Sequence, residues 1–244
     1  MIAILTSTLG GSKKIDGKRV PDRLIEKNGL LEELSPRWKD GAKMLIISGA
    51  PKEDPVNESV LCCMKGAFEL SGLKASCVYM CDGKNKELAE RIPEMDVVIL
   101  AGGHVPTQNG FLKELGLKEK LKSWDGLLLA WSAGAMNCAE TVYAGPELPG
   151  EAVDPKFRRW IEGLGITKTN IFPHFEELRD EMLDGMRLIE DITYADSMGH
   201  ELIALNNGSY IICENGTETL YGEAYSIKDG VQKQICEDGK CVRL

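Results

Sequence analysis

A serine between small residues, directly after an apolar run, is the feature of this sequence best suited to carry chemistry. The run Leu127–Ala130 continues as the pentapeptide A-W-S-A-G, with Ser132 at its centre. If the run is a buried parallel strand, the chain must turn into a helix near Ala133 within about one residue, and a nucleophile elbow is a turn of this kind. The spacing therefore predicts that Ser132 is a nucleophile above the carboxyl edge of a sheet, with the Ala133 amide facing a developing oxyanion. Alanine replaces the usual glycine at the first small position, and a serine that only caps a helix is the alternative interpretation.

A glycine pair follows another apolar run. Val97–Ala101 leads into Gly102-Gly103 and then into a polar stretch that ends at Asn109. Because glycine has no Cβ, two glycines in succession allow the backbone to come close to a ligand and to present its amides. We expect the Gly103 amide to complete an oxyanion hole with that of Ala133, and Gly102 and Asn109 to border the substrate. A plain tight turn is the alternative.

A histidine ends a third apolar run. Thr169–Phe172 is followed by Pro173 and His174, so a parallel sheet would bring His174 to the same edge as Ser132. From there an imidazole can take the serine proton and return it to the leaving group. A structural histidine is the alternative. The histidine beside the glycine pair, His104, is expected to border the site or to hydrogen-bond its own loop, and not to be catalytic.

The three features together resemble peptidase E and cyanophycinase, the S51 serine peptidases. That family carries a G-G loop, an S-A-G elbow and a P-H strand end in the same order, and the similarity extends from Met44 to about Ser209. The S-A-G and P-H motifs are the specific parts, since peptidase E has asparagine where His104 stands. The resemblance implies a sheet related to that of the class I glutamine amidotransferases, and a small peptide as substrate.

The resemblance also implies a third catalytic residue. The family's acid lies on the segment after the nucleophile helix, and its spacing from the serine reaches Glu147 in this chain. We therefore expect a Ser132–His174–Glu147 triad in which the glutamate orients the imidazole. Asp154 is the second choice, and a solvated surface acid is the alternative for both.

The segment after His174 bears on substrate specificity. Peptidase E removes N-terminal aspartate from dipeptides, and so needs a cation for the carboxylate of that side chain. Arg179 could pair with such a carboxylate in bidentate fashion, although its acidic neighbours could equally hold it in a surface ion pair. Asn206 matches the position where the family has a polar residue before G-S, and is expected to border the pocket. Aspartyl specificity stays open.

The elements that must position these residues alternate along the chain. Short apolar runs, without the two-residue alternation of half-exposed strands, are separated by helix-like segments, as in a parallel sheet buried on both faces. The predicted strands are Ile2–Thr6, Met44–Ser48, Ala75–Met80, Val97–Ala101, Leu127–Ala130 and Thr169–Phe172. We predict an α/β fold of the flavodoxin-like, three-layer, doubly wound type with a mostly parallel sheet, formed by residues 1–244 as a single domain.

Helices, loops and hairpins are predicted from apolar spacing and turn residues. One helix begins at Asp54 and Pro55, with Asp54 as its cap, and another runs from Glu176 to Ile192. Gly10–Pro21 is expected to be a surface loop. Near the C-terminus, Asn-Gly and Asp-Gly pairs separate short runs, which predicts antiparallel hairpins at one edge of the sheet.

The composition restricts the classes of partner and cofactor. With 29 Lys and Arg against 38 Asp and Glu, the chain has a net charge of −9, which argues against binding nucleic acid. No segment reaches the roughly 18 apolar residues that span a bilayer, and the first run lacks a signal-peptide pattern, so we expect a cytoplasmic protein that does not enter a membrane. The eight cysteines and three histidines show no zinc-like spacing, and we expect neither a metal nor an organic cofactor. A monomer or a homodimer is expected.

We therefore predict a serine peptidase that cleaves small peptides. Hydrolysis of a non-peptide ester or amide by the same triad is the first alternative, because one acyl-transfer machinery serves all of these substrates. A non-catalytic ligand-binding protein on the same fold is the second.

Overall fold

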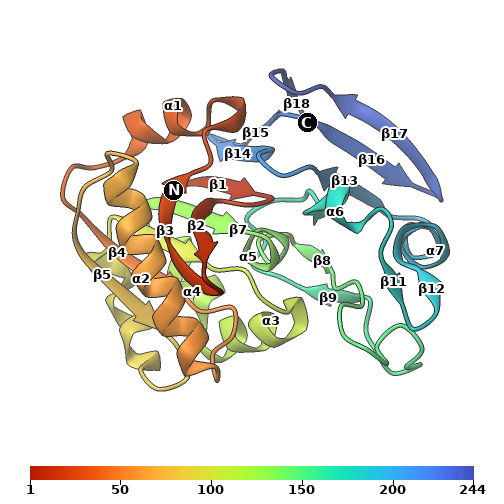
Figure 1. Cartoon of the computed structure of the whole chain (residues 1–244), viewed down its shortest axis with the longest axis horizontal. Coiled ribbons are helices and arrows are strands. Elements are labelled where there is room, and N and C mark those ends of the chain that lie inside the picture. The colour runs from red at the N-terminus through yellow and green to blue at the C-terminus, as the bar shows by residue number, and fades with distance from the viewer.

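A parallel sheet forms the centre of the molecule, and antiparallel strands extend it on one side. In the computed structural model, which describes residues 1–244, eight strands pair in the order β18-β15-β14-β1-β7-β6-β4-β5. The pairs from β1 through β5 are parallel, and those from β1 through β18 are antiparallel. The bounds are β1 Ile2–Thr6, β4 Ala42–Ile47, β5 Ala75–Cys81, β6 Val97–Leu100, β7 Leu127–Trp131, β14 Tyr210–Glu214, β15 Thr217–Tyr221 and β18 Cys241–Arg243. The predicted α/β class, with a mostly parallel sheet and antiparallel C-terminal strands, is confirmed (Figure 1).

The sheet is the middle of three layers, because its strands turn alternate side chains to two separate cores. Leu127 and Leu129 of β7 pack in one core, together with residues of α1 and α2. Leu128 and Ala130 pack in the other, together with residues of α3 and α4. The helices have the bounds α1 Leu30–Leu34, α2 Asp54–Leu70, α3 Val105–Glu114 and α4 Leu117–Lys122. Apolar side chains on both faces explain why the strand runs show no polar alternation.

A second, smaller sheet lies beside the first. It pairs β10 (Ile171–Phe172), β13 (Glu201–Leu205), β16 (Ala224–Lys228) and β17 (Val231–Cys236). The prediction that the strand before His174 joins the main sheet was therefore wrong, since β10 pairs in parallel with β13. An apolar run predicts burial but not the partner strand. Ile171 is buried, together with Ile203 of β13, in the same core as Leu128 and Ala130 of β7. Of the C-terminal hairpins, β14–β15 extends the main sheet and β16–β17 completes the second.

The segment after His174 is not one long helix. It folds as α6 (Phe175–Leu178), the short hairpin strands β11 (Met182–Leu183) and β12 (Met186–Arg187), a π-helical turn (Leu188–Thr193) and α7 (Tyr194–Asp196). Asp184 and Gly185 have φ of 53° and 83°, the conformation of a two-residue hairpin turn. This Asp-Gly turn overrides the helical spacing of the apolar residues around it.

Two smaller predictions also need correction. Gly10–Pro21 is not a loop, because β2 (Gly10–Ile15) and β3 (Lys18–Leu24) form a hairpin around a left-handed Asp-Gly turn. Asp54 does not cap α2: it lies inside the first turn, where its carboxylate forms an ion pair with Lys84.

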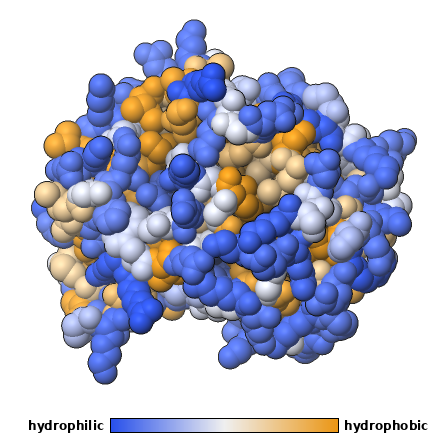
Figure 2. All heavy atoms as spheres, turned by 180° about the vertical axis from the view of Figure 1, so that it is seen from behind, coloured by the Kyte–Doolittle hydropathy of each residue, from blue (hydrophilic) through white to orange (hydrophobic).

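The remaining elements are short. They are α5 Ala133–Met136, β8 Thr141–Tyr143, β9 Trp160–Glu162 and three 3-10 segments, Lys27–Gly29, Ser35–Arg37 and Lys86–Glu94. No helix combines the length and the apolar character that a membrane crossing requires. Hydrophilic residues cover most of the face seen in Figure 2, and apolar residues reach it only in patches between them.

Candidate active site

Ser132 occupies a strained turn between β7 and α5. Its backbone has φ 53° and ψ −125°, a region that residues other than glycine rarely adopt and that costs roughly 1–3 kcal/mol. Hydrogen bonds on both sides fix the turn: the Ser132 amide donates to the carbonyl of Thr6 at 3.1 Å, and the Ser132 carbonyl accepts from the amide of Met136 at 3.0 Å. This is the geometry of a nucleophile elbow, as the sequence predicted.

Small residues surround the turn because neighbouring backbones come very close to it. A Cβ placed on Gly134 would lie 2.3 Å from the carbonyl oxygen of Leu100 in β6. A Cβ on Gly102 would lie 3.1 Å from Cβ of Ser132, and one on Gly103 would lie 2.4 Å from the carbonyl oxygen of Gly49. The glycines of both predicted motifs are therefore required by packing around the serine.

We expect Gly134→Ala to lower the free energy of unfolding by about 1–3 kcal/mol, because the added methyl group meets backbone atoms that cannot rotate away. Denaturant titration measures the change. Gly110→Ala is the matched control, since Gly110 also lies in a helix but its Cβ would meet nothing within 4 Å. A Gly134→Ala variant as stable as the wild type would contradict the close packing of α5 on β6.

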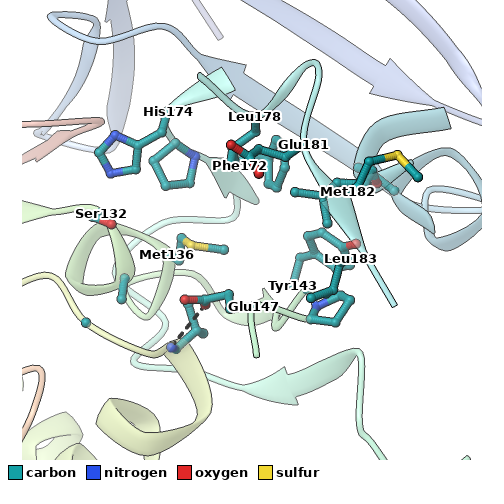
Figure 3. A pocket seen from close by; sticks show the side chains of 18 residues that line it. Ser132, Met136, Tyr143, Glu147, Phe172, His174, Leu178, Glu181, Met182 and Leu183 are labelled. Atoms are coloured by element: carbon teal, nitrogen blue, oxygen red, sulfur yellow. Dashed lines mark hydrogen bonds between the residues drawn. The ribbon is translucent and has the colours of Figure 1, made fainter. Parts of the chain in front are cut away.

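His174 is held near Ser132 by the end of β1. The residue follows β10 with a left-handed backbone, φ 57° and ψ 29°, and its amide donates to Oγ of Ser7 at 2.8 Å. Ser7 directly follows Thr6, whose carbonyl holds the Ser132 amide. Two adjacent residues thus anchor a serine from the main sheet and a histidine from the second sheet. Figure 3 shows His174 and Ser132 on the same side of one cavity.

Asn207 fixes the His174 ring. Nδ1 of His174 lies 2.8 Å from Oδ1 of Asn207, while Nδ2 of Asn207 donates to Oε1 of Glu177 at 2.6 Å. Because the NH₂ group must face the Glu177 carboxylate, the amide oxygen faces the ring, and an amide oxygen can only accept. Nδ1 therefore carries the proton, and Nε2 is left as the acceptor that a general base requires.

Carboxylates support the asparagine in turn. The backbone amide of Asn207 donates to both carboxylate oxygens of Glu176, at 2.6 and 2.8 Å. The Glu177 carboxylate lies 3.9 Å from Nδ1 of His174, close enough to stabilise an imidazolium. The sequence did not assign Asn207 or Ser7 to the site. Asn207 stands in an Asn-Gly pair that predicts only a turn, Ser7 belongs to no motif, and both reach His174 through tertiary contacts.

Glu147 is not a hydrogen-bond partner of His174. Its Oε1 accepts from the amide of Val105 at 3.3 Å, and it lines the cavity from another wall (Figure 3). The side chain that contacts the imidazole is Asn207 instead. The spacing after the serine could not show this, because it does not determine which wall of the cavity a residue reaches. Asp154, the second choice, is exposed and accepts from the amide of Lys156 at 2.9 Å, away from the cavity lining.

The surroundings of Glu147 change its titration. Its side chain is open to the cavity, yet the protein around it removes enough water from the carboxylate to raise its pKa, while the Val105 amide partly opposes that rise. A carboxyl group with a raised pKa in the folded state contributes stability below its ordinary pKa. That contribution is lost as the pH rises through the raised value.

Glu147→Gln, which carries no charge at any pH, should therefore raise the melting temperature at pH 7. The advantage should shrink as the pH falls toward the ordinary glutamate value of about 4.3. Calorimetry of both proteins across this range measures the effect. A wild type that is the more stable protein at pH 7 would show that the ionised carboxylate is stabilised by its neighbours.

All four predicted substrate-binding residues, Gly102, Asn109, Asn206 and Arg179, lie outside the cavity lining. Asn109 is buried, and its Nδ2 donates to Oδ1 of Asn137 at 2.9 Å and to the carbonyl of Glu162 at 3.0 Å, so it connects α3 to the end of α5 and to β9. Asn206 is buried one residue before the asparagine that contacts His174.

Arg179 stacks its guanidinium on the rings of Phe175 and Tyr225, with centroids 4.8 and 5.0 Å away. Tyr225 belongs to the second sheet, and Arg179 does not contribute to the cavity lining. The stacking of a cation on aromatic faces explains its position better than an acidic ligand does.

His104 has a structural environment. Its Nδ1 lies 2.8 Å from Oγ1 of Thr107, and its Nε2 lies 3.0 Å from Oε1 of Glu151. The other oxygen of Glu151 accepts from the amides of Glu147 and Leu148, each at 2.9 Å. His104 thus connects the glycine loop to the turn that carries Glu147.

The cavity has a volume of about 280 Å³ and is lined by 18 residues, including Gly103, Ser132, Ala133 and His174. The Gly103 amide donates no hydrogen bond within the chain, and Ala133 opens α5, where the first amides of a helix lack intrahelical acceptors. The volume is close to the lower limit of roughly 300 Å³ for small-molecule sites. No group of three His, Cys, Asp or Glu side chains is arranged to hold a metal ion.

A doubly wound α/β fold that presents a serine on a strained elbow, with a histidine on the same cavity, defines a serine hydrolase. The model of Peptidase family S51 matches residues 27–221, and the chain belongs to this family of serine peptidases. A search among curated proteins found no match.

Among solved structures, the chain is similar to that of a peptidase E candidate from Listeria monocytogenes EGD-e. The TM-score is 0.58, the identity is 14%, and the match covers 96% of this chain and 98% of the other. At this identity the similarity shows the shared fold.

Proposed function

We propose that this protein hydrolyses small peptides, with Ser132 as nucleophile, His174 as general base and acid, and Asn207 as the residue that positions the histidine. The observation that carries the proposal is the strained Ser132 turn on the same cavity as a histidine whose Nδ1 is held by an amide oxygen. The small volume of the cavity favours a short peptide over a protein substrate.

The chemistry follows from this arrangement. Oγ of Ser132 attacks the scissile carbonyl carbon while Nε2 of His174 takes the hydroxyl proton. The negative charge that develops on the carbonyl oxygen is stabilised by the amides of Gly103 and Ala133. When the C–N bond breaks, His174 gives the proton to the leaving amine.

Water completes the cycle. It attacks the acyl ester on Ser132 and loses its proton to His174, which returns that proton to Oγ as the acid product leaves. Each turnover consumes one water and one peptide bond and regenerates the free serine.

A fluorophosphonate probe tests the proposal, because it labels a serine only when the hydroxyl is activated. We expect intact mass spectrometry to show one adduct on the wild type and none on Ser132→Ala, with greatly slowed labelling of His174→Ala. A wild type that stays unlabelled under conditions that label a control serine hydrolase would contradict this function.

Substrate panels then identify the scissile bond. Dipeptides test peptidase activity, and matched esters and simple amides test hydrolysis of non-peptide substrates by the same residues. Hydrolysis of N-terminal aspartyl dipeptides gains no support from Arg179, because that side chain is stacked outside the cavity.

A further inference from the structure

The charged side chains of the catalytic cavity all have one sign. Of its 18 lining residues none is arginine or lysine, and the two carboxylates are Glu147 and Glu181. Figure 3 shows these two side chains reaching the cavity from different walls. A substrate with an acidic side chain would meet like charge there and find no compensating cation.

Neither carboxylate is committed to a cation of the protein. Glu147 accepts one hydrogen bond, from the Val105 amide at 3.3 Å, and the side chain of Glu181 has no hydrogen bond or ion pair within the chain. The neighbouring Glu151 is different, because its Oε2 accepts from two backbone amides and its Oε1 lies 3.0 Å from Nε2 of His104. Two carboxylates are thus available to a ligand.

Three arginines close in sequence to the lining residues are engaged elsewhere. Arg187, next to Leu188, forms an ion pair with Asp191 at 2.7 Å. Arg179 stacks on Phe175 and Tyr225. Arg159 donates to the carbonyl of Ala152 at 2.9 Å and approaches Asp196 at 3.4 Å. None of the three lines the cavity.

Apolar side chains make up half of the lining. Nine of the 18 residues are hydrophobic, among them Met136, Phe172 and Leu178, which lie near the catalytic serine and histidine in Figure 3. Such walls suit the methylene stem of a long side chain, while its charged end requires a partner of opposite sign. Desolvation, which raises the pKa of Glu147, would be offset by a bound cation.

We propose that the cavity selects peptides whose acyl-donating residue has a long basic side chain, with the stem against the apolar walls and the cationic end at Glu147 and Glu181. This specificity rests on the proposed peptidase function. It predicts the opposite charge preference from an aspartyl dipeptidase.

Three dipeptides that share a C-terminal alanine test the proposal: lysyl-alanine, norleucyl-alanine and glutamyl-alanine. Lysine and norleucine have similar stems and differ in the terminal ammonium, so their ratio isolates the charge. We expect kcat/KM for lysyl-alanine to exceed that for norleucyl-alanine by about tenfold or more, and glutamyl-alanine to be the poorest substrate. Glu147→Gln and Glu181→Gln should each move the lysine-to-norleucine ratio toward one.

Glu190→Gln is the matched control, since Glu190 is an exposed carboxylate outside the cavity, and both rates should stay unchanged. Norleucyl-alanine cleaved as well as lysyl-alanine, or a ratio that survives both variants, would overturn the specificity while leaving the peptidase function intact. Loss of fluorophosphonate labelling would instead overturn the function itself, so the two failures are distinguishable.

Discussion

Ser132→Ala should lower kcat/KM by roughly 10⁴–10⁶-fold, the largest effect expected of any single substitution in this chain. Without Oγ there is no atom to form the acyl intermediate, and the oxyanion amides alone support only residual catalysis. Side-by-side assays with the preferred dipeptide measure the change. A residual activity above roughly 10% of wild type would require another nucleophile or directly activated water.

The same position gives a stability test. Alanine keeps a Cβ at φ 53°, so Ser132→Ala should leave the unfolding free energy nearly unchanged. Ser132→Gly removes the strain of roughly 1–3 kcal/mol but adds about 0.5–1 kcal/mol of backbone entropy cost. We therefore expect the glycine variant to be the more stable of the two and equally inactive. Equal melting temperatures would show that the elbow stores little strain.

Local sequence determines the half of the site that surrounds the serine. The elbow, its small flanking residues and the glycine pair are each encoded within a few residues, because close backbone approach demands glycine wherever a Cβ would meet a carbonyl. The predicted strands agree with the structure to within two residues at each end, since buried apolar runs mark the strands of a parallel sheet. These parts could be predicted from the sequence alone.

The histidine half depends on tertiary contacts. The sequence shows a histidine after an apolar run. It does not show that this strand pairs with β13 in a second sheet, because apolar character does not specify the partner strand. Asn207 and Ser7 reach His174 across 33 and 167 positions of the chain. Nothing in the spacing after Ser132 could reveal that the side chain of Asn207, and not the carboxylate of Glu147, lies beside the His174 ring. Two errors were avoidable, since Asp16-Gly17 and Asp184-Gly185 are both strong hairpin signals.

Asn207→Ala should lower kcat by roughly 10²–10⁴-fold with a smaller change in KM. The substitution removes the acceptor for the Nδ1 proton, so the imidazole loses both its orientation and its preferred tautomer. Steady-state kinetics and the rate of fluorophosphonate labelling should fall together, because both depend on Nε2 as a base. The backbone amide of residue 207 keeps its bonds to Glu176, so circular dichroism and the melting temperature should stay near those of the wild type.

Exchanging the amide and the carboxylate separates positioning from a merely structural role. Asn207→Asp alone places a second carboxylate at the 2.6 Å contact with Glu177, where two like charges cannot both ionise, and activity should fall. Adding Glu177→Gln restores an amide donor to that contact and leaves the carboxylate beside Nδ1 of His174, as in a conventional triad. The double variant should therefore recover at least about tenfold in kcat over Asn207→Asp. If it recovers nothing, residue 207 does not act through the imidazole, and the orientation of His174 must depend on the Ser7 hydrogen bond to its backbone.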